Sequence, residues 1–223
     1  MANLNEFERA IKIPLVQSLL RFEDIELTDA ETEKLLTNES LEISEFSEEE
    51  SLIINNVINA LNYMQSLDIS KVKADLDLFI KLNSLLAKDQ ALFIGSLRNG
   101  FCSIPCIGQI PVPAEETVKE EIAKLNSISL SHSSPENNSS DNYKLIASEC
   151  FCNLARLQPF WDGNKRTALC LCNMELLKHD FDLLIIPEDK YAGFEERLTP
   201  FYKKENDDVI GYLARNCFMK QRC

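Results

Sequence analysis

The chain has 223 residues, of which 45% are hydrophobic, and its formal net charge is −13 with a pI near 4.7. Because nucleic acids and acidic membranes are polyanions, this charge argues against both as partners, and any nucleotide site needs a local positive field. The sequence has no apolar run of about 18 residues and no secretory signal pattern, so we expect a cytoplasmic protein with mostly buried, free cysteine thiols.

The first 47 residues are expected to form a helical extension. Apolar residues recur at helical spacing over residues 3–20, although Pro14 should kink or restart that helix. A short helix is predicted after the capping residue Thr28, and an acidic connection covers residues 38–46.

Two amphipathic helices are predicted next. Ser47, followed three residues later by Glu50, forms the pattern of a capping box and predicts a helix start. The second helix, about residues 72–87, has Asn83 on its apolar face, and we expect this asparagine to be a satisfied buried polar group.

Glycines and prolines interrupt the helical pattern between Gly95 and Pro113, where short apolar segments predict a β-hairpin. Because proline removes a backbone donor, at least one strand should lie at an edge that can pair with an extended peptide. A hairpin that only connects two helices explains the same residues, so both interpretations stay open.

The rest of the chain is predicted to be helical. Apolar spacing predicts helices over residues 114–128, from a cap at Asp141 to about residue 157, and in two closing segments, with a polar loop at residues 131–140. The helix predicted at residues 164–178 is apolar nearly all round, which places it at the centre of a bundle.

One loop carries the clearest chemical signal. Pro159 disfavours helix in the residue before it, and Gly163 permits a positive φ immediately before the next helix. That helix should therefore begin abruptly, with Asn164, Lys165 and Arg166 in its first turn. Backbone N–H groups, the helix dipole and two cationic side chains then converge, a combination that suits an anion such as phosphate.

The segment Gln158-Pro-Phe-Trp-Asp-Gly-Asn-Lys-Arg resembles the signature of the Fic/Doc (Fido) family, in which a histidine stands first. Residues 95–98 and 106–108 are similar to that family's flap hairpin. The resemblance implies an all-α, mainly helical Fic-type bundle with one small β-hairpin flap. It divides the chain into an N-terminal extension, a Fic domain and a tail, at residues 1–47, 48–218 and 219–223.

The same resemblance implies binding of ATP or another nucleoside triphosphate with Mg²⁺. It also implies transfer of AMP, or of phosphate in Doc-like members, to a hydroxyl of an unidentified target protein. Asp162 would hold Mg²⁺ through the phosphates, an arrangement that suits a hard cation. The phosphates would contact Gly163, Asn164, Lys165 and Arg166, and the target would contact the flap through Arg98, Phe101, Ile104 and Ile107.

Three residues depart from the family pattern. Lys165 replaces the glycine of most AMP-transferring members and resembles the Doc-like form, and Leu169 stands where many members have a second arginine. Gln158 replaces the histidine that serves as general base. An amide has no proton affinity near neutral pH, and general-base catalysis contributes about 10²–10⁴ in rate. We therefore expect weak or absent transfer activity.

The helix after Ser47 contains a second similarity, because Ser51, Asn55 and Asn56 resemble the family's inhibitory pattern Ser/Thr-x-x-x-Glu-Gly/Asn. Asn55 stands in place of the glutamate. Residues 51 and 55 lie one turn apart and could reach a common partner. A polar helix face with no inhibitory role is an equal alternative.

Two other functions stay open. An active Doc-like phosphotransferase or AMP-transferase could use a non-histidine mechanism, in which Gln158 positions the nucleophile and another group, such as His132 or His179, is the base. A non-catalytic protein-interaction or antitoxin-like module would instead bind a partner through the flap edge and the acidic surface.

Overall fold

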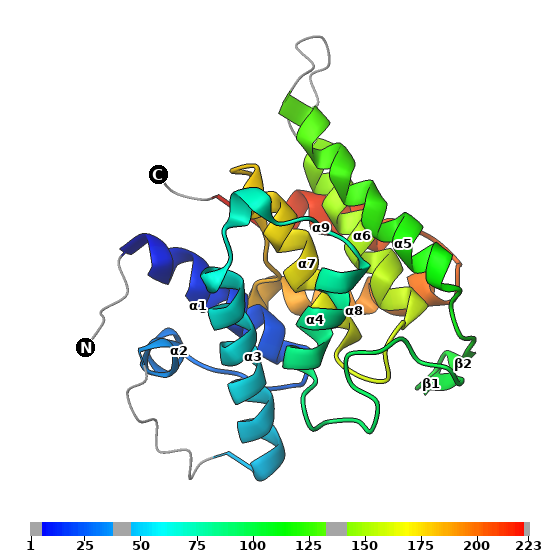
Figure 1. Cartoon of the computed structure of the whole chain (residues 1–223), viewed down its shortest axis with the longest axis horizontal. Helices are drawn as coiled ribbons and strands as arrows, with labels where there is room; N and C mark the ends of the chain where they lie inside the picture. The colour runs from blue at the N-terminus through cyan, green and yellow to red at the C-terminus, as the bar shows by residue number, and fades with distance from the viewer. Residues whose placement is uncertain (1–5, 38–45, 133–141, 221–223) are drawn as a thin grey trace.

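The computed structural model describes residues 6–37, 46–132 and 142–220, so residues 38–45, the loop after residue 132, the cap predicted at Asp141 and the last three residues lie outside it. The described residues form a mainly helical bundle with a small antiparallel hairpin, which confirms the predicted fold class (Figure 1). In chain order the elements are α1 (Glu6–Arg21), α2 (Asp29–Leu36), α3 (Glu48–Ser66), the 3-10 turn η2 (Ile69–Lys71), α4 (Leu76–Leu86), β1 (Cys102–Ile104), β2 (Gly108–Ile110), α5 (Glu115–Ala123), the 3-10 segment η3 (Lys124–His132), α6 (Asn142–Leu157), α7 (Asn164–Lys178), β3 (Leu183–Leu184), α8 (Glu188–Tyr202), α9 (Asp208–Asn216) and β4 (Phe218–Met219).

Helix starts follow the predicted caps. The Ser47 hydroxyl accepts from the Glu50 backbone N–H at 3.1 Å, and the Glu50 carboxylate accepts from the Ser47 N–H at 2.8 Å. Thr28 begins α2 with the same capping box. The helix does not restart at Pro14, because α1 is one helix with this proline inside it. Tertiary packing of α1 against the core outweighs the lost backbone hydrogen bond.

Helix α7 lies at the centre of the bundle, as its apolar sequence predicts (Figure 1). Residues 168–172 have no exposed surface, and α4 and α6 pack along the helix. The first turn of α7 is therefore held in a fixed place relative to its neighbours. No helix in the described part of the chain is long and apolar enough to cross a membrane.

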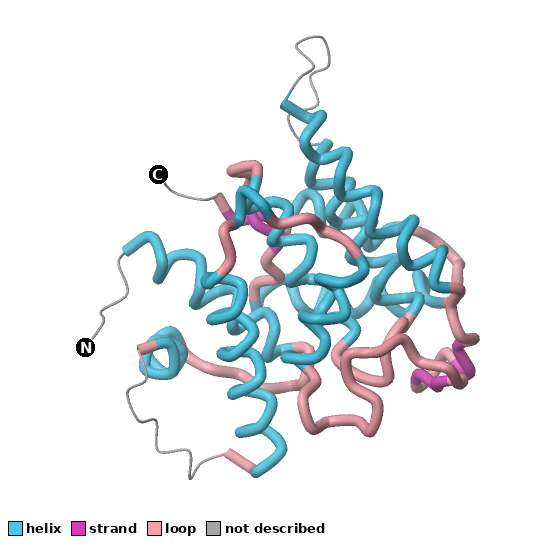
Figure 2. The backbone as a smooth tube through the Cα atoms, in the orientation of Figure 1, coloured by secondary structure: helices cyan, strands magenta, loops and turns pink. Residues whose placement is uncertain are grey.

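The predicted hairpin is present as β1 and β2, which pair antiparallel with Cys102 opposite Ile110. It lies at one edge of the molecule, beside the loops that enter α7 (Figure 2). A second pair, β3 and β4, was not predicted, and it includes Met219 from the expected tail. Strands of two residues are too short to give an alternating apolar pattern.

Candidate functional site

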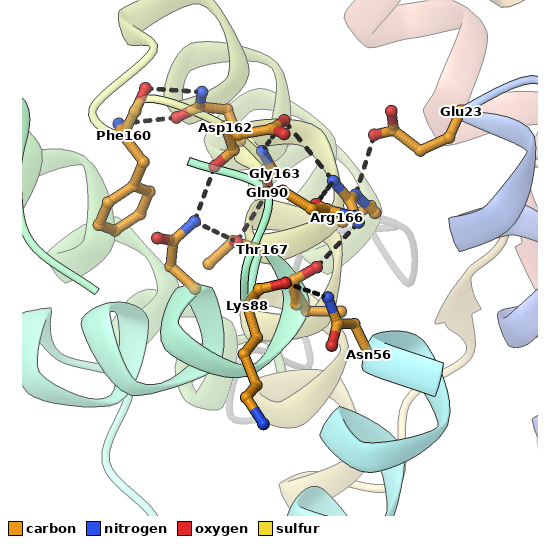
Figure 3. Close-up of polar contacts among 12 residues, drawn as sticks. Glu23, Asn56, Lys88, Gln90, Phe160, Asp162, Gly163, Arg166 and Thr167 are labelled. Carbon is orange, nitrogen blue, oxygen red and sulfur yellow. Dashed lines mark hydrogen bonds and ion pairs between the residues drawn. The ribbon is translucent and has the colours of Figure 1, made fainter. Parts of the chain in front are cut away.

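The loop before α7 is shaped by Asn164. Its Oδ1 accepts from the Phe160 backbone N–H at 2.8 Å, and its Nδ2 donates to the Phe160 carbonyl at 3.0 Å (Figure 3). Nδ2 also donates to Gln158 Oε1 at 2.9 Å. The side chain of Asn164 therefore fixes the loop, and α7 starts without a side-chain cap.

Gly163 precedes α7 in the left-handed conformation, with φ at +70°, as the sequence predicts. A Cβ atom here would lie 3.1 Å from Ala87 Cβ and 3.4 Å from Asn83 Nδ2, so both the φ angle and the close packing favour glycine. Asn83 is the satisfied buried group that was expected, since it donates to the Asp162 carbonyl at 2.9 Å and to Thr167 Oγ1 at 3.3 Å.

Arg166 is fully buried, and its guanidinium is engaged by the protein itself (Figure 3). It donates from Nη1 to the Leu86 carbonyl and from Nη2 to Gln90 Oε1, each at 2.8 Å. Its Nε lies 2.9 Å from a carboxylate oxygen of Glu23, in an ion pair that lacks hydrogen-bond alignment, and Nη2 lies 3.6 Å from Asp162 Oδ1. The cation predicted to hold phosphate therefore already holds two carboxylates.

Glu23 comes from the turn after α1, next to a buried aromatic anchor. Phe22 is 6% exposed, and Lys165 Nζ lies 5.1 Å from its ring centroid. The Phe22 ring also packs at 6.0, 6.3 and 6.1 Å from the rings of Phe151, Tyr191 and Phe194. This packing fixes the end of α1 and presents the Glu23 carboxylate to Arg166.

The charges at this site are poorly solvated. Burial raises the pKa of Glu23, and attraction by Arg166 opposes that shift. Burial likewise lowers the pKa of Lys165, against the attraction of Glu23 and Glu195. An anion that brought more negative charge to the start of α7 would stabilise both cations.

Asp162 could bind Mg²⁺, as expected, only together with further ligands from a bound nucleotide. Its side chain is 40% exposed, and its Oδ1 accepts from the Gly163 N–H. Among the described residues, no group of three His, Cys, Asp or Glu side chains could hold a metal. Mg²⁺ would therefore need phosphate oxygens as further ligands, as is usual for this ion.

The Gln158 amide cannot accept a proton near neutral pH, and it is hydrogen-bonded to neighbouring residues. Nε2 donates to the Ala155 carbonyl at 2.7 Å, and Oε1 accepts from Asn164. His179 cannot serve as the missing base, because it follows the last residue of α7, about 22 Å along the axis from Asn164. The side chain of His132 lies outside the described part of the chain.

The four predicted flap residues have different environments. Phe101 is 66% exposed, while Ile104 and Ile107 line a cavity together with Gln158. Arg98 differs from the prediction, because only 2% of its surface is exposed and so its side chain is closed to a partner. Its guanidinium instead donates to the backbone carbonyls of Gly100, Ile110, Pro111, Leu157 and Gln158.

Of the three residues in the inhibitory-like motif, Ser51, Asn55 and Asn56, only Asn56 is described with a contact near the site. Asn55 is exposed and Ser51 is half-buried. Asn56 is 2% exposed and donates from Nδ2 to the Lys88 carbonyl at 2.7 Å, two residues before Gln90 (Figure 3). Asn56 thus supports the backbone of the segment that contacts Arg166.

Sequence reasoning missed two partners of Arg166. Glu23 lies in a segment that was expected to be an N-terminal extension, and no local pattern marks it. Gln90 follows α4 in a turn region without periodicity. Burial of an arginine in the first turn of an apolar helix was the available signal, because a buried guanidinium requires carboxylate or carbonyl partners.

The Fic/DOC family model matches residues 73–176, and no curated protein matches the chain. Among solved structures, Fic-1 from C. elegans has a TM-score of 0.69 and 18% identity, covering 96% of this chain and 63% of that one. A Fic family protein from Desulfovibrio desulfuricans has a TM-score of 0.60 and 17% identity, covering 96% and 65%. A Fic domain containing signaling protein from Bacteroides thetaiotaomicron has a TM-score of 0.68 and 15% identity, covering 96% and 84%. This chain thus spans less than two thirds of the first two proteins, and these likenesses concern the fold.

Proposed function

We propose that this chain, in which residues 73–176 match the Fic/DOC family model, binds a nucleoside triphosphate at the start of α7, with weak or no transfer of AMP to a target-protein hydroxyl. One contrast within a single loop carries the proposal. Residues 162–166 combine a carboxylate, a left-handed glycine, a helix start without a side-chain cap and two cations. Residue 158, in contrast, carries an amide in place of a base.

In this proposal the phosphates accept hydrogen bonds from the backbone at the start of α7 and pair with Lys165. Arg166 joins them only after Glu23 withdraws, because the Glu23 carboxylate now lies against Nε. Mg²⁺, held by Asp162 and phosphate oxygens, would neutralise the remaining phosphate charge. In this proposal the adenine and ribose would contact the surrounding helices.

Calorimetric titration with ATP and Mg²⁺ tests the binding half of the proposal, and no heat at millimolar nucleotide would contradict it. Radiolabelled ATP tests the activity half. Label transferred from the α-phosphate indicates AMP transfer, whereas label transferred only from the γ-phosphate indicates the Doc-like reaction. A high rate of either in the wild-type protein would favour an active enzyme with a non-histidine mechanism.

Glu23→Gln should tighten binding of ATP with Mg²⁺ by roughly tenfold. The substitution removes the negative charge that competes with phosphate for Arg166, so a larger fraction of molecules can accept the nucleotide. Calorimetry measures the change, with Glu26→Gln as the matched control, because Glu26 is exposed on the same segment. Equal affinity in both variants would show that Glu23 does not compete with nucleotide.

The affinity difference between wild type and Glu23→Gln should shrink as pH falls. The pKa of Glu23 is raised in the folded protein, so its carboxyl takes up a proton at a higher pH than an ordinary glutamate does. The nearby charged groups, which are Arg166, Asp162, Lys165 and Asp24, remain in both proteins. Titrations between pH 7 and 5 measure the difference, and a constant ratio across that range would contradict the assignment.

A second candidate is a non-catalytic protein-interaction module, and one observation favours it. Leu92, Phe93 and Phe101 are 95%, 62% and 66% exposed. Exposed apolar side chains of this size are common in binding surfaces. Capture of a partner that is unaffected by ATP and Mg²⁺ but lost in Phe93→Ser and Phe101→Ser variants would support this function over nucleotide-dependent transfer.

A further inference from the structure

A cavity of about 420 Å³ lies between the flap and α8, and it includes the position of the missing base. Ile104 and Ile107 at the tip of the flap form its apolar wall, and Gln158 and Lys165 belong to the loop and the start of α7. The cavity therefore connects the flap directly with the cationic helix start.

Helix α8 supplies the remaining wall. Glu195, Leu198, Thr199 and Tyr202 all line the cavity, and their spacing of three, four and seven residues puts them on one helix face. Glu195 is the one carboxylate among the residues that line this cavity. It is exposed, and so it is open to a group that enters from solvent.

Two residues near Glu195 have pKa values that respond to its charge. Burial lowers the pKa of Lys165, and the negative charges of Glu23 and Glu195 oppose that shift. Burial raises the pKa of Tyr191, one turn earlier on α8, and the negative charge of Glu195 raises it further. Glu195 and Lys165 line the same cavity, while the amide of Gln158 is bound to Ala155 and Asn164.

We propose that Glu195 accepts the proton of a target-protein hydroxyl placed in this cavity, the role that Gln158 cannot perform. The inference rests on the proposed function. In the step, the hydroxyl oxygen bonds to the α-phosphorus of the nucleoside triphosphate, and the bond from that phosphorus to the bridging oxygen breaks. Pyrophosphate leaves with the bonding electrons, and the hydroxyl proton passes to the Glu195 carboxylate. A carboxylate is a weaker base than imidazole, which agrees with slow transfer.

The test compares Glu195→Gln in two backgrounds, wild type and Gln158→His. The assay measures incorporation of label from α-labelled ATP into short peptides that each contain one serine, threonine or tyrosine. Glu195→Gln should lower incorporation by about tenfold or more in the wild type. It should change incorporation less than twofold in the Gln158→His background, because an imidazole then supplies the base.

Glu196→Gln is the matched control, since Glu196 is the next residue, has a 78% exposed side chain and pairs with Arg197. It should leave incorporation unchanged. Equal losses from Glu195→Gln in both backgrounds, no loss in either, or no detectable transfer by the wild type would overturn the proposal. Calorimetry with ATP and Mg²⁺ distinguishes failure of this inference from failure of the proposed function. If the wild type binds ATP, nucleotide binding stands even when Glu195 is not the base. If the wild type does not bind ATP, both proposals are wrong.

Discussion

Gln158→His is expected to raise the rate of AMP transfer by about 10²–10⁴, the usual contribution of a general base. The backbone at residue 158 is compatible with the change, because its φ of +47° lies in the left-handed region, where histidine is enriched. The residue already lines the cavity beneath the flap, so an imidazole would enter the space where a hydroxyl is expected. Incorporation of label from α-labelled ATP measures the rate.

The control for this gain is Gln158→Asn, which keeps an amide and should not raise the rate. Affinity for ATP should be similar in all three proteins, because the Gln158 amide carries no charge that could pair with a phosphate. If Gln158→His binds nucleotide normally but stays as slow as wild type, the rest of the site is not competent for transfer. The interaction-module function would then become the better account.

Arg98→Met is expected to lower the free energy of unfolding by about 3–5 kcal/mol, because several carbonyls lose their donor and each buried unsatisfied group costs about 1–3 kcal/mol. The guanidinium donates to five backbone carbonyls, including those of Leu157 and Gln158 at the entry to the α7 loop. It also holds the ends of the hairpin through Gly100, Ile110 and Pro111. Methionine fills similar space but leaves these acceptors without a donor.

Urea denaturation measures this loss, and Arg215→Met is the control, since Arg215 is exposed on α9 and its loss should cost less than about 0.5 kcal/mol. Hydrogen exchange should also quicken in β1 and β2 before the rest of the fold is affected. A loss below about 1 kcal/mol for Arg98→Met would show that other contacts hold the hairpin to the loop.

Local signals predicted the parts of this fold that depend on neighbouring residues. Ser47 with Glu50 marks a helix start because the reciprocal hydrogen bonds need only a spacing of three. Gly163 marks the turn into α7 because its φ of +70° favours a residue without a Cβ. The fold class and the backbone turn before α7 could therefore be predicted from short segments of the chain.

Contacts between segments that are distant in the sequence could not be predicted from local patterns. Glu23 meets Arg166 because Phe22 packs into an aromatic cluster built from α6 and α8, and no spacing rule connects these positions. Arg98 was assigned to a partner surface, whereas the folded hairpin buries it. Glu195 lines the cavity with Gln158 only because α8 packs beside the flap. Each of these depends on tertiary packing, which overrides what the local sequence predicts.

The most direct test of nucleotide binding follows backbone amide resonances while ATP and Mg²⁺ are added. The account predicts the largest chemical-shift changes at Gly163, Asn164, Lys165 and Arg166, with saturation at lower nucleotide concentration in Glu23→Gln than in wild type. Unchanged resonances at these four residues at millimolar nucleotide, or changes confined to another surface, would contradict it.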